Sequence, residues 1–234
     1  MDCSNLFAPV IGQIQAITLL QNAITKNRIA PAYLFAGPTG VGRALTARLF
    51  AGTLLAQGLS PEQSDLAIRR AAAGNHPDLW WVEPTFLHQG KRLTLTEAIT
   101  AGLKRKAPPQ IRIEQIREIG QFLSKPPLEA RQAMVIIESA ETMPEAAANA
   151  LLKTLEEPGR ATIILIAPAA ESLLPTLVSR CQKIPFHRLN SGDLETVLRR
   201  LGQADILEHA VLMATGSPGE AIGAYEKQQT IPSD

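Results

Sequence analysis

A glycine-rich segment that follows a short apolar run most constrains the fold of this chain. The segment Gly37-Pro-Thr-Gly-Val-Gly-Arg-Ala44 comes directly after Ala32-Tyr-Leu-Phe-Ala36. Its spacing is that of a phosphate-binding loop, G-x-x-x-x-G-K-[ST]. A strand, this turn and a helix beginning near Arg43 would direct backbone N–H groups and a helix N-terminus toward an anion. The residues expected to form the loop site are Gly37, Thr39, Gly40, Val41, Gly42, Arg43 and Ala44.

The last two positions of the motif depart from the consensus. Arg43 stands where a lysine reaches the β- and γ-phosphates, and Ala44 stands where a hydroxyl binds Mg²⁺. Arginine keeps the positive charge but is a planar fork rather than a compact ammonium group, and alanine offers the metal no ligand. We interpret the loop as a nucleotide-binding scaffold that has lost turnover. The alternative is a glycine-rich turn without function.

A second defect follows the apolar run Ala133–Ile137, which has the composition of a buried strand. In phosphate-loop ATPases such a strand ends in an acid that positions Mg²⁺, and a following glutamate activates water. Here Glu138 supplies the acid, as a degenerate form of that motif, and Ser139 takes the place of the glutamate. Two independent defects both predict that hydrolysis is lost.

Strands and helices alternate along the chain, which predicts a parallel, doubly wound sheet flanked by helices. Residues 1–188 are expected to form this domain, and residues 189–234 a small all-helical lid. Further strands are expected at Leu79–Val82, Thr162–Ile166 and Gln182–Phe186. Helices are expected at Asn5–Ile29, Leu45–Gln57, Ser60–Ala73, Ile111–Leu123, Met143–Glu157, Leu194–Leu201 and Ile206–Thr215, and from Gly219 toward Tyr225. The second of these helices should bury Leu45, Leu49, Phe50 and Leu54.

The segment Thr85–Gln110 is the least regular and is interpreted as a solvated connection. Its Lys104-Arg-Lys106 cluster raises the alternative of a DNA-binding module, because basic clusters bind phosphate backbones. A formal net charge of +1 gives the whole chain no electrostatic attraction to nucleic acid. His76, which precedes a proline, is interpreted as a turn residue.

Composition excludes several other classes of protein. The chain has 234 residues, of which 45% are hydrophobic, enough for one large domain or a large and a small one. Its two cysteines, Cys3 and Cys181, are too few for a cysteine-only zinc site and make a disulfide framework improbable. No signal-peptide pattern and no membrane-length apolar run is present, so a cytoplasmic setting is expected.

Two motifs resemble one family. The segments Asn149-Ala-Leu-Leu-Lys-Thr-Leu-Glu-Glu-Pro158 and Leu173-Leu-Pro-Thr-Leu-Val-Ser-Arg-Cys181 are similar to those of the AAA+ clamp-loader subunits of bacterial DNA polymerase III. The resemblance covers nearly the whole chain, and the degenerate loop points to the delta-prime branch of this family. It implies an AAA+ P-loop domain followed by a helical lid. It also implies a stator subunit that does not hydrolyse ATP, in a complex that loads a sliding clamp on primed DNA.

The resemblance assigns a role to Arg180, which it places as an arginine finger in the ATP site of a neighbouring subunit. Ser179 and Cys181, which complete the motif, are expected to be catalytic with it. The implied partners are clamp-loader ATPase subunits of the gamma/tau type and the delta subunit. The sliding clamp and primed DNA are then contacted through the complex, and no membrane is involved.

Several positions depart from the family pattern. The four cysteines of the family's zinc module are absent, so no metal and no zinc is expected. Ala167-Pro-Ala169 and Glu220 replace residues that sense nucleotide, and the family's helical collar domain has no counterpart in these 234 residues. The chain is therefore expected to be a fragment or to assemble differently. No cofactor is required on this interpretation. ATP or ADP binding stays open, as does the alternative of a weakly active ATPase that uses Arg43.

Overall fold

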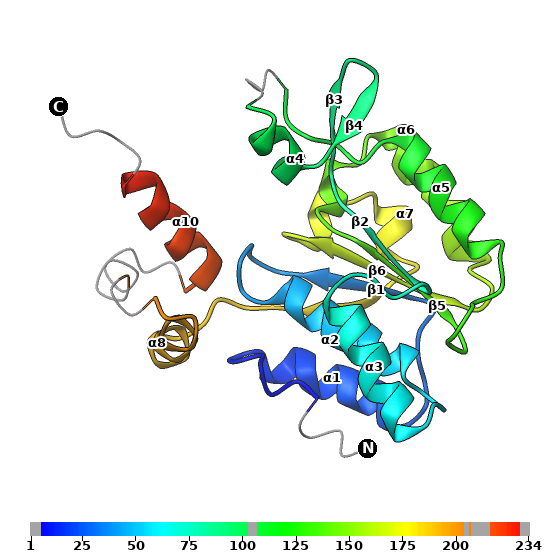
Figure 1. The fold of residues 1–234 in the computed structure, drawn as a ribbon, viewed down its shortest axis with the longest axis horizontal. Coiled ribbons are helices and arrows are strands. Elements are labelled where there is room, and N and C mark those ends of the chain that lie inside the picture. The colour runs from blue at the N-terminus through cyan, green and yellow to red at the C-terminus, as the bar shows by residue number, and fades with distance from the viewer. Residues whose placement is uncertain (1–5, 103–106, 204–205, 207–215, 230–234) are drawn as a thin grey trace.

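The computed structural model describes residues 6–102, 107–203, 206 and 216–229. Within these residues a parallel sheet of five strands has the order β2–β5–β6–β1–β7 (Figure 1). The strands are β1 (Ala32–Ala36), β2 (Leu79–Val82), β5 (Ala133–Ile137), β6 (Ala161–Ala167) and β7 (Gln182–Pro185). Each lies within one residue of a predicted strand at either end. The predicted α/β P-loop fold is confirmed.

Helices cover both faces of the sheet (Figure 1). One layer holds α1 (Ile14–Thr25), α2 (Arg43–Leu55) and α3 (Pro61–Ala72), and the other holds α5 (Ile113–Leu123), α6 (Glu145–Glu156) and α7 (Pro175–Val178). Side chains alternate between the layers, as they do along any strand: Tyr33 and Phe35 pack toward the first, and Leu34 toward the second. Burial on both faces explains why the strands read as continuous apolar runs.

Two helix predictions need correction. The helix expected at Asn5–Ile29 begins only at Ile14, because Gly12 has a left-handed backbone with φ +74° just before it. Leu45 was expected on the buried face of its helix, but it is 41% exposed. Phe50 and Leu54 are buried as predicted, and Leu49 is partly buried.

The connection expected at Thr85–Gln110 is not a plain loop. It contains a hairpin of β3 (Phe86–His88) and β4 (Lys91–Leu93), followed by α4 (Leu95–Thr100). Gln89 and Gly90 both have positive φ, as the two-residue turns that match the twist of a hairpin require. Thr94 and Glu97 then form a capping box that starts α4. The cluster Lys104–Lys106 lies outside the described residues.

A separate apolar cluster lies beyond the sheet, formed by α8 (Ser191–Arg200), α10 (Pro218–Gln229) and neighbouring residues. Its buried members are Leu189, Leu194, Leu198, Ile206 and Ala221. The helix predicted at Ile206–Thr215 falls, apart from its first residue, outside the described part of the chain. The domain boundary at residue 188 stays a prediction. No helix in the described ranges has the length and apolarity needed to cross a membrane.

Candidate functional site

The glycine-rich loop connects the end of β1 to the first residue of α2. Gly42 precedes α2 with φ +102°, and no side chain caps this 13-residue helix. The first N–H groups of a helix have no partner within the helix, and those of α2 adjoin the loop. Such a loop at the carboxyl edge of a parallel sheet can bind an anion.

Arg43 lies inside the loop region and is only 9% exposed. Its Nη2 donates to Thr39 Oγ1 at 3.3 Å, whereas its buried Nη1 has no partner among the described residues. Burial lowers the pKa of Arg43, and the carboxylates of Glu141 and Glu138 oppose that shift. An arginine stays charged despite such a shift. Arg43 therefore presents a buried cationic nitrogen that an oxyanion could satisfy.

The two positions where Mg²⁺ ligands were expected hold an alanine and a glutamate that already accepts one hydrogen bond. Ala44 is half-buried and packs against the apolar core. Glu138, directly after β5, accepts a hydrogen bond from Trp81 Nε1 at 3.0 Å. The guanidinium carbon of Arg48 lies 3.9 Å from the centre of the Trp81 ring, so the guanidinium packs against the face of the indole. Ser139, at the position expected for the water-activating glutamate, has a left-handed backbone with φ 52°.

The first turn of α10 contacts the loop directly. Ser217 is fully buried, and its hydroxyl donates to the Thr39 carbonyl at 2.6 Å. The backbone N–H of Gly219 donates to the Gly40 carbonyl at 3.2 Å. Glu220, which was expected to replace a nucleotide-sensing residue, forms an ion pair with Arg188 at 3.0 Å. The segment around Ser217 and Gly219 thus holds the loop by donating to two of its backbone carbonyls.

Gln13 was not singled out from the sequence, although it is one of the few buried polar residues near the loop. Its Nε2 donates to the carbonyls of Val41 at 3.3 Å and His187 at 2.7 Å, and its Oε1 accepts from the His187 N–H at 3.0 Å. One amide therefore joins the start of α1, the loop and the segment after β7. The sequence signal that could have identified Gln13 is a glutamine placed directly before an amphipathic helical pattern.

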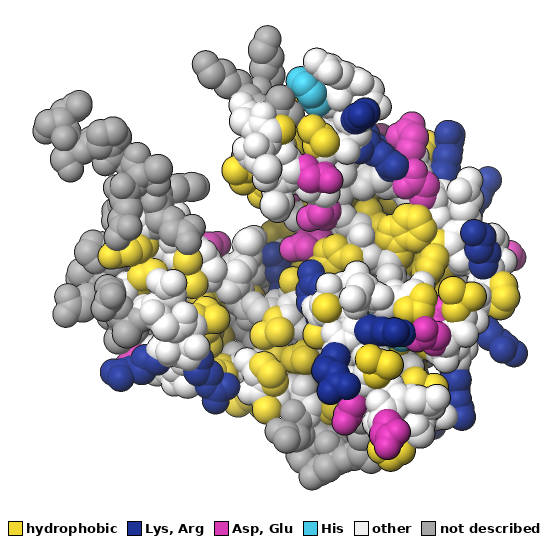
Figure 2. Space-filling model, in the orientation of Figure 1, with side chains coloured by type: hydrophobic (Ala, Val, Ile, Leu, Met, Phe, Trp, Pro, Cys, Tyr) yellow, Lys and Arg dark blue, Asp and Glu magenta, His cyan; other side chains and the backbone are white. Residues whose placement is uncertain are grey.

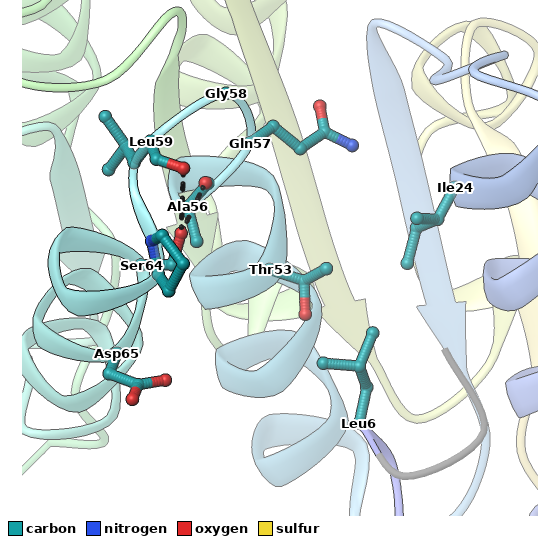
Figure 3. Close-up of a pocket in the computed structure, with 10 residues that line it drawn as sticks. Leu6, Ile24, Thr53, Ala56, Gln57, Gly58, Leu59, Ser64 and Asp65 are labelled. Carbon is teal, nitrogen blue, oxygen red and sulfur yellow. Dashed lines mark hydrogen bonds between the residues drawn. The ribbon is translucent and has the colours of Figure 1, made fainter. Parts of the chain in front are cut away.

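An apolar pocket of about 260 Å³ adjoins the loop. Its walls come from residues 9–11, Gly40–Gly42, α8 and the start of α10. A flat, largely apolar ring such as a nucleobase suits a pocket of this kind beside an anion site. A larger pocket of about 580 Å³ lies away from the loop, where Leu6, Ile24 and the connection from α2 to α3 meet (Figure 3). Among the described residues of its lining, Asp65 is the only charged one.

Arg180 lies at the opposite edge of the sheet from the loop. Arg180 directly precedes β7, which runs parallel to β1, whereas the loop follows the carboxyl end of β1. Arg180 therefore lies where the amino ends of the strands meet, which is called the amino edge here. Its Nη2 pairs with Glu156 Oε1 at 2.7 Å, and its Nη1 donates to the Thr176 carbonyl at 3.0 Å. Arg180 therefore lies away from the phosphate loop of its own chain.

The two residues beside Arg180 make supporting contacts. Ser179 Oγ donates to the Thr176 carbonyl at 3.0 Å. Cys181 packs against the apolar core, and burial raises the pKa of its thiol to about 11. A thiol with that pKa is almost entirely protonated at neutral pH and is a poor nucleophile. The expected catalytic roles of Ser179 and Cys181 stay predictions.

The structure thus brings the expected site residues together in two places. Gly37–Ala44 and Glu138 share the carboxyl edge, and Ser179–Cys181 lie at the amino edge. Among the residues described here, no three His, Cys, Asp or Glu side chains are grouped as metal ligands. The expectation that no zinc is bound stays a prediction, since it rests on the sequence.

Comparisons with known proteins agree with this architecture. A family model described as "DNA polymerase III, delta subunit" matches residues 12–190. DNA polymerase III subunit delta′ of Bacillus subtilis is 35% identical over 216 residues, covering 90% of this chain and 58% of that protein. The subunit of the same name from Pseudomonas aeruginosa is 34% identical over 199 residues, covering 81% of this chain and 54% of that protein. The chain therefore spans a little over half the length of these relatives.

A solved structure of the Thermotoga maritima RuvB Holliday junction branch migration motor superposes with a TM-score of 0.55. It is 14% identical, and the match covers 91% of this chain and 60% of that one. At this identity the likeness concerns the fold alone.

Proposed function

Because the chain belongs to the DNA polymerase III delta subunit family, we propose that it is a non-hydrolysing stator subunit of a clamp loader. In this proposal Arg180 enters the ATP site of a neighbouring ATPase subunit and stabilises the charge that develops on the transferred phosphoryl group. The partners are ATPase subunits of the gamma/tau type and a delta subunit, and the assembly loads a sliding clamp on primed DNA.

One observation carries the proposal: Arg180 lies at the end of the strands opposite to the phosphate loop of its own chain. Arg180 is partly exposed at the amino edge of the sheet, with a side chain 38% accessible, while the loop at the other edge lacks its magnesium ligand. A chain with a degenerate site of its own and an exposed, oriented guanidinium at the far edge is suited to act on a partner's nucleotide. Engagement of Glu138 by Trp81 supports the lack of intrinsic hydrolysis.

The test uses a reconstituted clamp loader in which only the ATP site beside this subunit keeps an intact phosphate loop. Arg180→Ala is expected to lower single-turnover hydrolysis by about 10³–10⁵-fold, the range typical of arginine fingers. Arg70→Ala is a matched control, because Arg70 is also 38% accessible and also pairs with a glutamate, Glu129. An Arg180→Ala complex that hydrolyses ATP at the normal rate would defeat the proposal.

A second candidate function is nucleotide binding without hydrolysis. The unpartnered Nη1 of Arg43 and the apolar pocket beside Gly40–Gly42 favour it, because together they offer an anion contact and a place for a ring. Calorimetric titration of the chain with ADP tests it. Absence of heat at millimolar ADP would reduce the loop to a structural scaffold.

The third candidate, a DNA-binding module that uses Lys104–Lys106, rests on sequence alone. On the face drawn in Figure 2, the Lys and Arg side chains of the described residues are scattered rather than gathered in one patch. A steep loss of affinity for primed DNA with rising salt would be needed to support this candidate.

A further inference from the structure

The guanidinium of Arg180 is held by acceptors from two different helices. Glu156, in the last turn of α6, accepts a hydrogen bond from Nη2, and the carbonyl of Thr176 in α7 accepts one from Nη1. The backbone is fixed as well, because the Arg180 N–H donates to the carbonyl of Leu177, a fully buried residue. Two of the five guanidinium donors are thereby occupied, and the rest are available to another group.

Glu156 is poorly suited to the helix that carries it. The C-terminal end of an α-helix has a partial negative charge, so acidic side chains in the last turn are unfavourable there. Glu156 ends α6 and Glu157 follows directly, which places two acids at this end. Among the described residues, Glu156 forms an ion pair and Glu157 forms none. The local benefit of Glu156 therefore lies in its contact with Arg180.

We propose that Glu156 is a positioning residue for Arg180: it selects one orientation of the guanidinium before the neighbouring subunit docks. This inference rests on the function proposed above. An exposed, long side chain would otherwise sample many rotamers, and a misplacement of about 1 Å can cost a catalytic group about 10²-fold in rate. Since the pair is exposed on both sides, it can adjust by small movements when phosphate arrives.

The experiment uses the same reconstituted complex with one intact neighbouring ATP site. Glu156→Ala is expected to lower kcat at that site by about 10- to 100-fold and to leave the KM for ATP unchanged, because the substrate is bound by the neighbour. Glu156→Gln keeps an acceptor oxygen and should restore most of the rate. Glu157→Ala is the matched control, one residue along the same exposed helix end, and should have no effect. In an Arg180→Ala complex, adding Glu156→Ala should change nothing further.

The outcomes separate this inference from the function on which it rests. If Arg180→Ala lowers hydrolysis and Glu156→Ala does not, the positioning role is wrong and the arginine finger stands. A rise in kcat with Glu156→Ala would also overturn it, because Glu156 would then restrain Arg180 rather than orient it. If Arg180→Ala itself has no effect, the proposed function fails first. Thermal unfolding of each variant alone, expected to match that of the parent chain, shows that the fold is kept.

Discussion

Gly40 of the phosphate loop and Gly219 of α10 touch backbone to backbone. A Cβ atom built on Gly219 would lie 2.7 Å from the Cα of Gly40, and one built on Gly40 would lie 2.8 Å from the Cα of Gly219. No side chain fits between them. The N–H of Gly219 also donates to the Gly40 carbonyl, so the position of α10 is set directly by the loop.

Substitution of Gly219 tests this contact. Gly219→Ala should lower the free energy of unfolding by about 1–3 kcal/mol, because the added methyl group meets backbone that cannot move aside cheaply. Gly223→Ala in the same helix is the control: its Cβ meets nothing within 4 Å, so it should stabilise the chain by about 0.5–1 kcal/mol. Urea unfolding measures both. Equal stability of the Gly219→Ala and parent chains would mean that the contact can open freely.

The departures at Arg43 and Ala44 predict how nucleotide binding depends on Mg²⁺. The parent chain should bind ADP with the same affinity with and without Mg²⁺, because Ala44 has no oxygen ligand and Trp81 engages Glu138. In the double variant Arg43→Lys with Ala44→Thr, Mg²⁺ should strengthen binding. Calorimetric titrations in Mg²⁺ and in a chelator compare the two chains. Strong Mg²⁺ dependence in the parent chain would contradict this account.

The buried carboxylate of Asp78 holds a turn whose importance the sequence did not reveal. Its carboxylate accepts backbone N–H groups from three successive residues at 2.6 to 2.8 Å, namely Leu128, Glu129 and Ala130. Asp78 is 2% exposed, so Asp78→Ala leaves these donors without a partner and should cost about 3 kcal/mol or more in urea unfolding. The exposed Asp65 provides the control, and Asp65→Ala should change stability by less than about 0.5 kcal/mol.

His76 makes the stability of the chain depend on pH. Burial lowers its pKa below the ordinary value of 6.5, an effect that Asp78 and Glu129 oppose and Arg70 reinforces. The unfolded chain therefore binds the His76 proton more readily than the folded chain. The stabilising contribution of neutral His76 to the free energy of unfolding is therefore complete above about pH 6.5 and falls as the pH is lowered below that value.

His76→Asn should flatten this part of the pH profile. Asparagine keeps an acceptor for the Asp78 N–H, which now donates to His76 Nδ1 at 3.1 Å, and it does not titrate. Urea unfolding between pH 5 and 8 compares the two chains, a range chosen to span the ordinary histidine pKa of about 6.5. An unchanged slope in the variant would assign the pH dependence to other groups.

The sheet and the loop were predictable because their causes are local. Ala133–Ile137 is apolar without interruption, as a strand buried on both faces must be, and Gly40 and Gly42 stand where the chain needs positive φ. The capping box of α3, formed by Ser60 and Gln63, likewise depends on residues three apart, and the helix starts as expected.

The missed features depend on partners that are distant in sequence. Gln13 lies 174 residues from His187, and Trp81 lies 57 residues from Glu138. No periodicity within a helix or strand encodes such pairs. Leu45 was misassigned for a related reason: an apolar residue at helical spacing is also what lines a surface pocket, and Leu45 borders the pocket beside the loop.

The hairpin segment has one further consequence. The N–H of Thr85 donates to the Gln110 carbonyl at 2.9 Å, and the N–H of Gln110 donates to the Thr85 carbonyl at 3.1 Å, so the segment between them leaves and rejoins the fold at a single point. Gln115 secures that point by bonding both Thr85 and the Glu83 carbonyl. Because its two ends pair with each other, a change of length within the hairpin should leave the register of the sheet intact, and the main contact it would remove is the ion pair of Arg92 with Glu118 on α5.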